Sequence, residues 1–128
     1  MDNPISATDA VPVGWHTVSP RLVAHDAQQL VEFLGQVFGA KGEYRKDARS
    51  VVRIGDSVVM VSDAGVRDPM TAFLYVYVGD VDATYRRALD AGAHSLEEPR
   101  DVPDGDHRCM VKDRWGNTWQ IAAHRGRA

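Results

Sequence analysis

The chain has 128 residues, of which 44% are hydrophobic and 26% are charged, and its formal net charge is −3. This composition fits one folded domain, is too apolar for a disordered chain and lacks the basic excess typical of nucleic-acid-binding proteins. No apolar run approaches the roughly 20 residues of a membrane-spanning helix, and the single cysteine, Cys109, excludes a disulfide within one chain. Residues 1–18 show no signal-peptide pattern, so we expect a cytoplasmic protein that binds neither nucleic acid nor membranes.

The first half of the chain predicts one strand, one helix and three further strands. The first strand covers about Thr17–Val23. The helix begins after Asp26, a residue type that caps helix N-termini, and ends at Gly39-Ala40, where glycine takes the left-handed conformation at low cost. Between these ends, apolar residues recur at helical spacing. Three short β-rich segments follow, near residues 42–45, 51–54 and 57–62, with a tight-turn signal at Gly55-Asp56.

The second half repeats the same order. A strand at about Ala72–Val78 precedes a helix that begins at Asp80 or Asp82 and ends at Gly92-Ala93. Three strands are then predicted near residues 94–97, 107–111 and 118–123. Each half therefore reads β-α-β-β-β. We expect a single domain over residues 1–128, with module 1 at about 17–63, a polar connector at 64–70 and module 2 at about 71–124.

Alternation along the strand after the connector separates two faces. Leu74, Val76 and Val78 form an aliphatic face suited to packing on a helix, and Phe73, Tyr75 and Tyr77 form an aromatic face. Because each module has one helix, its sheet has a second face that must meet something else. Aromatic rings with hydroxyl groups suit the wall of a ligand cleft. We interpret the aromatic face as such a wall, and a half-exposed sheet surface is the simpler alternative.

Several short motifs follow one another in a characteristic order. They are Val23-Ala24-His25-Asp26, Ile54-Gly55-Asp56-Ser57-Val58-Val59-Met60, Val76-Tyr77-Val78-Gly79-Asp80-Val81-Asp82-Ala83, Gly105-Asp106 and the terminal Asp113-Arg114-Trp115-Gly116-Asn117-Thr118-Trp119. In order and spacing they resemble the vicinal oxygen chelate superfamily, which includes glyoxalase I, bleomycin-resistance proteins and extradiol dioxygenases, and most of all its compact PhnB-like and bleomycin-resistance-like members. The resemblance covers about Ser19–His124 and departs from the pattern at Arg114-Trp115, where such relatives usually carry Pro-Phe. It implies an α+β fold in which two tandem βαβββ modules form a curved mixed β-sheet cleft with the helices outside.

The resemblance also implies where a metal ion would be held. In metal-dependent members one His or carboxylate side chain comes from the first and the last strand of each module. These positions fall on Ser19, Met60, Phe73 and Gln120. None of the four side chains is an imidazole or a carboxylate, the usual ligands of divalent metals. We therefore expect no metal and no other cofactor.

The predicted ligand-binding cleft contains residues from both modules: Ser19, Arg21, Met60, Phe73, Tyr75, Tyr77, Trp115 and Gln120. No catalytic residue is assigned. Among the five histidines, His107 is the best candidate for a general base near neutral pH, and the hydroxyl group of Tyr75 is a second acid–base candidate. His124 shares its strand parity with Gln120 and is a candidate for the cleft rim.

Three functions are compatible with these residues. The favoured one is a metal-free small-molecule-binding protein of the glyoxalase/bleomycin-resistance type that sequesters an aromatic or planar compound, in a resistance or natural-product role. The alternative is a cofactor-free isomerase, cyclase or lyase that uses the same cleft, and a divalent-metal glyoxalase or dioxygenase is least favoured. We also expect a homodimer, in which the modules pair within one chain or are exchanged between two.

Overall fold

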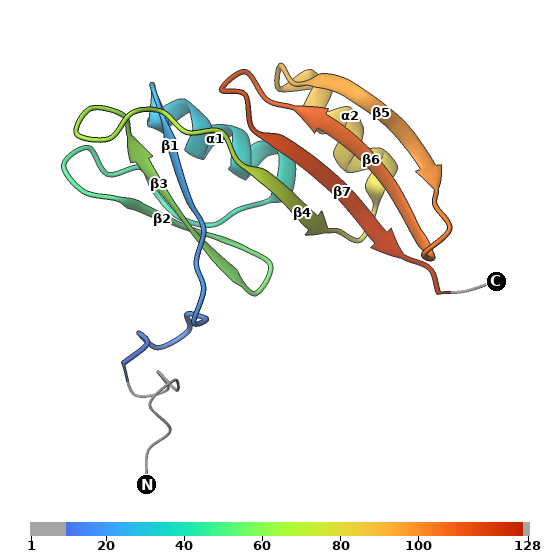
Figure 1. Ribbon diagram of the computed structural model, residues 1–128, viewed down its shortest axis with the longest axis horizontal. Helices are drawn as coiled ribbons and strands as arrows, with labels where there is room; N and C mark the ends of the chain where they lie inside the picture. The colour runs from blue at the N-terminus through green and yellow to red at the C-terminus, as the bar shows by residue number, and fades with distance from the viewer. Residues whose placement is uncertain (1–9, 127–128) are drawn as a thin grey trace, which may run out of the picture.

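The computed structural model describes residues 10–126, which form two helices and two small sheets (Figure 1). The elements in chain order are β1 (Arg21–Ala24), α1 (Ala27–Phe38), β2 (Ser50–Ile54), β3 (Ser57–Asp63), β4 (Phe73–Tyr77), α2 (Val81–Asp90), β5 (His94–Asp101), β6 (Asp106–Lys112) and β7 (Thr118–His124). The first sheet has the order β1-β3-β2 and the second the order β4-β7-β6-β5. In each sheet the strand before the helix pairs in parallel with the last strand, and the remaining pairs are antiparallel. The predicted α+β class with mixed sheets is confirmed.

The first module differs from the prediction because the segment near residues 42–45 is not a strand. Its ladder pairing is limited to one isolated bridge between Lys41 and Arg53. Gly42 has a φ of 140°, which residues with side chains rarely adopt, and a Cβ atom there would lie 2.3 Å from the carbonyl oxygen of Val51, so the chain leaves the strand conformation directly after Lys41. The amide of Arg45 then donates to the Ser50 hydroxyl (2.8 Å) and not to a neighbouring strand. The first sheet therefore has three strands.

The two helices begin in different ways. Asp80 accepts a hydrogen bond from the Ala83 amide (3.0 Å) and caps α2, as predicted. The predicted capping of α1 by Asp26 is wrong, because Asp26 has a φ of 62° and its side chain makes no capping bond. The Ala27 amide instead donates to Asp63 at the end of β3 (3.1 Å). The other end of α1 agrees with the prediction, since Gly39 has a φ of 67°.

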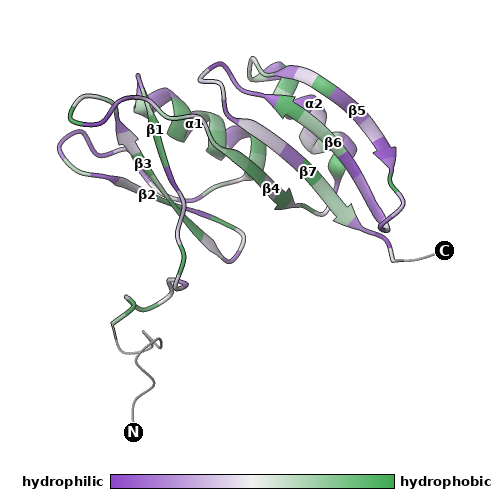
Figure 2. Ribbon diagram, viewed as in Figure 1, coloured by the Kyte–Doolittle hydropathy of each residue, from purple (hydrophilic) through white to green (hydrophobic). Residues whose placement is uncertain are grey.

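Both helices pack on the same side of the sheets and share one core (Figure 1). The core joins Leu22, Leu34 and Val61 of the first module to Trp119 and Ile121 of the second. Figure 2 shows the same arrangement in hydropathy, with apolar residues concentrated on α1 and β4 and polar residues along β5. The opposite face of the second sheet is not covered by either helix, so it is available for function.

The terminal motif forms a turn built around one buried carboxylate. Asp113 is 2% exposed and accepts hydrogen bonds from the backbone amides of Trp115 and Asn117, each at 2.9 Å. Its second oxygen accepts from the Asn117 side-chain amide (3.0 Å) and from the Trp119 indole (2.9 Å). Asn117 in turn accepts from the Ala72 amide (2.9 Å), which fixes the start of β4. The motif thus sets the position of the strand that carries the aromatic face.

Within residues 10–126, neither helix has the length and apolar character needed to cross a membrane.

Candidate functional site

The aromatic face of β4 lies on the uncovered side of the second sheet. Phe73 is 65% exposed, Tyr75 38% and Tyr77 62%, whereas the alternate residues Leu74 and Val76 pack against the core. This is the division between the two faces that the strand alternation predicts. The pairing register extends each row across the sheet: Tyr75 lies beside Gln120, which pairs with Met110, and Tyr77 lies beside Ala122, which pairs with Arg108.

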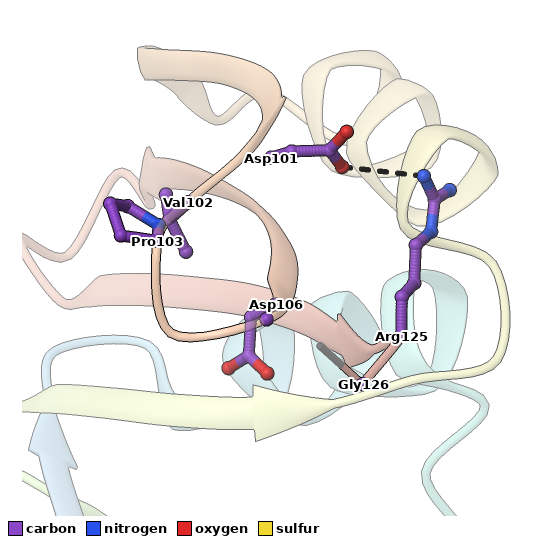
Figure 3. A pocket seen from close by; sticks show the side chains of 7 residues that line it. Asp101, Val102, Pro103, Asp106, Arg125 and Gly126 are labelled. Atoms are coloured by element: carbon purple, nitrogen blue, oxygen red, sulfur yellow. Dashed lines mark hydrogen bonds and ion pairs between the residues drawn. The ribbon is translucent and has the colours of Figure 1, made fainter. Parts of the chain in front are cut away.

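A buried carboxylate holds the two tyrosine hydroxyl groups. Asp106, the first residue of β6, is 4% exposed, and Figure 3 shows its carboxylate directed toward β4. One oxygen accepts hydrogen bonds from the hydroxyl groups of Tyr75 (2.5 Å) and Tyr77 (3.0 Å). The other oxygen lies 2.7 Å from Nδ1 of His124. Both rings are therefore fixed at their tips while much of their surface stays exposed.

The two tyrosine side chains of β4 reach Asp106 of β6 because β7, the strand between β4 and β6, carries a small residue at the crossing. Asp106 belongs to β6, and β7 separates that strand from β4. Ala122 of β7 pairs with Tyr77 and is fully buried. The two phenol rings lie 5.3 Å apart between centroids, with an interplanar angle of 54°. A methyl side chain at position 122 leaves space for the rings to cross β7.

The cluster has a defined charge state near neutral pH. Burial, together with the hydrogen bond to Asp106 and its charge, raises the pKa of Tyr75 to about 12. Hydrogen bonds from Tyr75 and His124 outweigh the effect of burial and lower the pKa of Asp106 below its usual value. Asp106 is thus a carboxylate and Tyr75 a neutral phenol at pH 7. This arrangement suits Tyr75 to holding a ligand ring and not to removing a proton.

A pair of opposite charges lies farther along the same face. Arg108 of β6 and Glu97 of β5 approach to 3.6 Å between Nη2 and Oε1. The Arg108 Nε and the Glu97 Oε1 atoms are buried and have no hydrogen-bond partner in the described part of the chain. The open face therefore has an aromatic side on β4 and a charged side on β5 and β6.

The predicted cleft residues of the first module lie on a separate sheet. Arg21 pairs with Met60 across β1 and β3, and its guanidinium lies 3.5 Å from the Met60 sulfur. Ser19 is half-buried and lies two residues before the start of β1. Val23 of β1 forms one isolated bridge with Met70 of the connector, and no strand pair joins the two sheets in the described residues.

Trp115 is not brought to the aromatic face. Its ring packs edge-to-face on Phe33 of α1, with 5.9 Å between centroids, and its indole donates to the carbonyl of His25 (2.9 Å). The structure thus separates Trp115 from Phe73, Tyr75 and Tyr77. The turn fixed by Asp113 directs residue 115 toward the start of α1.

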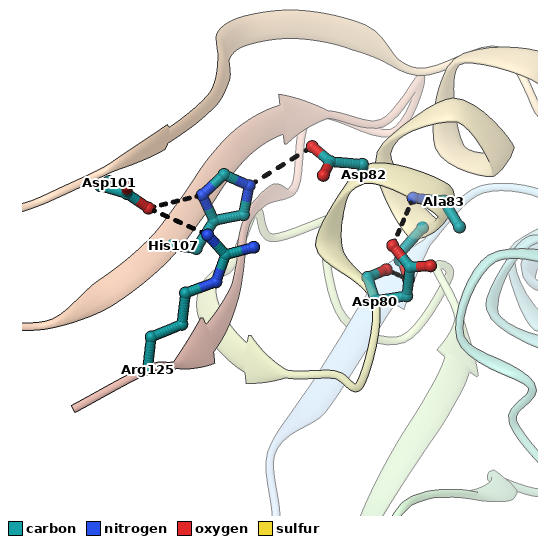
Figure 4. Close-up of polar contacts among 7 residues, drawn as sticks. Asp80, Asp82, Ala83, Asp101, His107 and Arg125 are labelled. Carbon is teal, nitrogen blue, oxygen red and sulfur yellow. Dashed lines mark hydrogen bonds and ion pairs between the residues drawn. The ribbon is translucent and has the colours of Figure 1, made fainter.

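His107 is also separated from the tyrosine cluster. Its Nδ1 lies 2.9 Å from Asp101 and its Nε2 lies 3.3 Å from Asp82 at the start of α2 (Figure 4). Arg125 contacts the same Asp101 oxygen at 3.3 Å. Because neighbouring residues of a strand point to opposite faces, Asp106 faces the tyrosines and His107 faces the helix. Sequence reasoning selected His107 and missed Asp106.

The residues at the family's metal positions do not fit a metal ion. Ser19, Met60, Phe73 and Gln120 offer a hydroxyl, a thioether, a phenyl ring and an amide, which is not the donor set of a divalent cation. The Arg21 guanidinium beside the Met60 sulfur adds a positive charge at one of the four positions. Nor do residues 10–126 hold any group of three or more His, Cys, Asp or Glu side chains close enough to bind an ion.

Two hollows adjoin these residues. One, of about 210 Å³, lies between the two sheets and is lined by residues of the β2–β3 hairpin, the segment before β1, and β4 and β7: Val18, Pro20, Ile54, Gly55, Asp56, Ser57, Val58, Val59, Leu74, Tyr75, Val76, Tyr77 and Trp119. The other, of about 580 Å³, lies at the β5–β6 loop and is lined by Asp101, Val102, Pro103, Gly105, Asp106, Arg125 and Gly126 (Figure 3). Figure 3 shows the Asp106 carboxylate directed away from Asp101 and Arg125. The smaller hollow is thus the one that adjoins both tyrosines.

Comparison with known proteins agrees with the architecture. The protein Mb0911c of Mycobacterium bovis is 30% identical over 124 residues, covering 81% of this chain and 80% of that protein. The crystal structure of TioX from Micromonospora sp. ML1 superposes with a TM-score of 0.71 at 25% identity, covering 85% of this chain and 98% of TioX. The fosfomycin resistance protein FosX from Mesorhizobium loti shares the fold, with a TM-score of 0.65 at 16% identity over 84% of this chain and 91% of FosX. A sequence model of the Glyoxalase/Bleomycin resistance protein/Dioxygenase superfamily matches residues 16–121, and the chain belongs to this superfamily.

Proposed function

We propose that this protein binds a small aromatic or planar compound without a metal ion, on the open face of its second sheet. The observation that carries the proposal is the pair of exposed tyrosine rings whose hydroxyl groups are fixed on the buried Asp106. Rings that are already ordered lose little conformational freedom when a ligand stacks on them, which favours affinity. Phe73 extends the same face, and Gln120 lies beside Tyr75 as a hydrogen-bonding group.

The available interactions are of the right size for micromolar binding. Burying about 200 Å² of apolar ligand surface contributes roughly 5 kcal/mol at about 25 cal/mol per Å², before ordering costs. A micromolar dissociation constant corresponds to about 8 kcal/mol. Stacking on the tyrosines together with hydrogen bonds to Gln120 and Arg108 supplies the difference.

The proposed biological role is sequestration of a toxic or biosynthetic compound, for resistance or in natural-product metabolism. Its support is membership of a superfamily that includes bleomycin resistance proteins, and the shared fold of a fosfomycin resistance protein. The net charge of −3 is too small to select a cationic over a neutral ligand.

The test is a calorimetric titration with planar aromatic compounds of different charge, such as acridine, naphthalene carboxylate and doxorubicin. We expect one class to bind in the micromolar range. Tyr77→Ala removes an exposed ring and should weaken this binding at least tenfold. Leu89→Ala on α2, a partly exposed apolar residue on the helix side, is the matched control and should leave the affinity unchanged. No heat with any compound, or equal affinity in the Tyr77 variant, would refute the proposal.

A cofactor-free isomerase, cyclase or lyase is the second candidate. The specific observation in its favour is the Asp106–His124 hydrogen bond of 2.7 Å, because a carboxylate that orients an imidazole is a common acid–base arrangement. Conversion of a bound compound that is lost in His124→Ala, with binding retained, would identify an enzyme. Binding without any conversion in the wild-type protein would support the sequestration role.

We further propose that the protein forms a homodimer in the cytoplasm. Val66, Met70 and Leu96 are large apolar residues outside the aromatic face that remain exposed in one chain, and a partner copy is one way in which proteins cover such surfaces. Light scattering should give twice the 14.1 kDa mass of one chain. A monomer at micromolar concentration would contradict this part of the proposal.

A further inference from the structure

Arg108 of β6 lies on the same face of the second sheet as the tyrosine rings. It pairs with Ala122 of β7, and Ala122 pairs with Tyr77 of β4, so the three residues form one row across the sheet. Burial and Asp106 raise the pKa of Tyr75, whereas a hydrogen bond from Arg108 lowers it, which places the guanidinium beside the phenol hydroxyl. The face thus presents a positive group directly next to an aromatic surface.

The charge of Arg108 is only partly balanced within the protein. Its side chain is 19% exposed, and the carboxylate of Glu97 lies 3.6 Å away, farther than the about 2.7–2.9 Å of a charge-assisted hydrogen bond. Glu97 is also shared, because Arg100 approaches its other oxygen to 3.7 Å. The Arg108 Nε atom has no hydrogen-bond partner in the described part of the chain. A largely buried cation that shares one carboxylate with a second cation has lost hydration that its partner does not fully replace, and a ligand anion can supply the missing charge.

Asp106, a second carboxylate on this face, does not balance Arg108. One of its oxygens accepts from both tyrosine hydroxyl groups, and the other lies 2.7 Å from Nδ1 of His124. The register of the described strands places these charged residues on the open face: Arg100, Arg108, Lys112, Glu97 and Asp106. With the histidines neutral they carry one net positive charge, in a chain whose net charge is −3. The open face therefore favours an anionic ligand over a cationic one.

We propose that Arg108 is the anion-binding residue of this face and that the ligand is a planar aromatic carboxylate. The carboxylate accepts hydrogen bonds from the guanidinium, whose planar set of donors suits such groups, and the ring lies against Tyr75 and Tyr77. Because the guanidinium adjoins the Tyr75 hydroxyl, one small ligand can reach both the rings and the charge. The inference rests on the proposed ligand-binding function and specifies its ligand class.

The experiment uses 2-naphthoate, 2-naphthamide and 2-naphthamidine, which have the same shape and are negative, neutral and positive at pH 7. In calorimetric titrations of the full chain, the carboxylate should bind about tenfold more tightly than the carboxamide, because charge-assisted hydrogen bonds are about twice as strong as neutral ones. The amidine should bind more weakly than either. The preference for the carboxylate should shrink between about 10 mM and about 1 M salt, as the Debye length falls from roughly 30 Å to roughly 3 Å.

Two variants of Arg108 and one control test the residue itself. Arg108→Gln should lower the affinity for the carboxylate to that for the carboxamide, which should itself stay unchanged. Lys112→Gln is the matched control, since it removes the same charge from an exposed position on the same face of β6, and it should preserve the preference. Melting temperatures show whether the variants fold. Arg108→Lys keeps the charge without the planar donors and should retain part of the preference.

The outcomes separate this inference from the proposed function. Equal binding of the carboxylate and the carboxamide in the wild-type protein overturns the inference and leaves the ligand-binding function intact, and so does a full preference that persists in Arg108→Gln. Tightest binding of the amidine would assign the recognition to Glu97 and would also overturn it. If none of the three probes binds but another planar compound does, only the inference fails. Absence of binding by every planar compound refutes both.

Discussion

The charge of Asp106 controls the ionisation of Tyr75, and Asp106→Asn tests this dependence. The side chain keeps its size and an oxygen that accepts a hydrogen bond, but it loses its negative charge. In the wild-type cluster a phenolate at Tyr75 would lie against the carboxylate at the present hydrogen-bond distance of 2.5 Å. The variant removes this repulsion and leaves the burial of the phenol unchanged.

The magnitude follows from the pKa of Tyr75, which is raised from 10.0 to about 12. With a pKa of 12, about one tenth of the phenol is ionised at pH 11, and with a pKa of 10 about nine tenths is ionised. Burial is the largest cause of the shift, followed by the hydrogen bond to Asp106 and its charge. The pKa in the Asp106→Asn variant should therefore lie between 10 and 12, with a clearly larger ionised fraction at pH 11.

The measurement is the carbon-13 chemical shift of the tyrosine Cζ atom, which separates the four tyrosines. Tyr75→Phe assigns the signal, and Tyr85, which bonds to the Ser95 hydroxyl on the helix side, is an internal control that should not change. The same ionised fraction at Tyr75 in the wild type and the variant would show that Asp106 does not control this phenol. The account of the site as rings fixed by a buried charge would then fail.

Three further predictions concern stability and packing. Asp113→Ala leaves the Trp119 indole and the Asn117 side-chain amide without an acceptor in the core, so the free energy of unfolding in urea should fall by about 3–5 kcal/mol. Asp113→Asn should cause a smaller loss. A loss below about 1 kcal/mol in Asp113→Ala would contradict the role of the turn. Ala122→Leu should lower the free energy of unfolding by about 1–3 kcal/mol, because the larger side chain overpacks a buried position. It should also bring the pKa of Tyr75 closer to 10, because the leucine separates the tyrosine rings from Asp106. An unchanged pKa would show that the rings do not cross β7 at this residue. The free energy of unfolding should also decline at both ends of the pH range. The raised pKa of Tyr75 stabilises the fold fully below pH 10, and this stabilisation is lost toward pH 12, whereas the stabilisation from the lowered pKa of Asp106 is lost as the pH falls below 3.8. A urea midpoint that stays constant from pH 8 to 12 would contradict the effect of Tyr75.

The sequence predicts the elements that depend on local signals. The apolar spacing from Leu30 to Val37, followed by Gly39, predicts α1, and the alternation from Phe73 to Val78 predicts both β4 and its two faces. These elements form because the pattern of a single segment determines which side is buried. The superfamily was also identified from the order of its motifs.

The same local signals give wrong predictions where a contact with a segment far along the chain determines the structure. Asp26 has the residue type and position of a helix cap, yet Asp63, 37 positions along the chain, accepts the hydrogen bond from the helix. The segment near residues 42–45 is predicted as a strand, but Gly42 takes a positive φ beside Val51, where a side chain would not fit, and the pairing ends at the Lys41–Arg53 bridge. Neither contact has a sequence signal, because each depends on how two segments meet after folding.

The choice of His107 over Asp106 illustrates the limit for the site itself. Strand parity places adjacent residues on opposite faces, so His107 and Asp106, one position apart, contact different groups. His107 also titrates near neutral pH, which makes it the more conspicuous residue, whereas Asp106 has the composition of an ordinary loop carboxylate. One signal was available: if Tyr75, Gln120 and Met110 form a row across the strands, then His107 must face the helices and Asp106 the tyrosines. Deriving that row requires the pairing of β6 with β7, and the register of this hairpin is fixed by the buried Asp113 turn and not by the residues of the site.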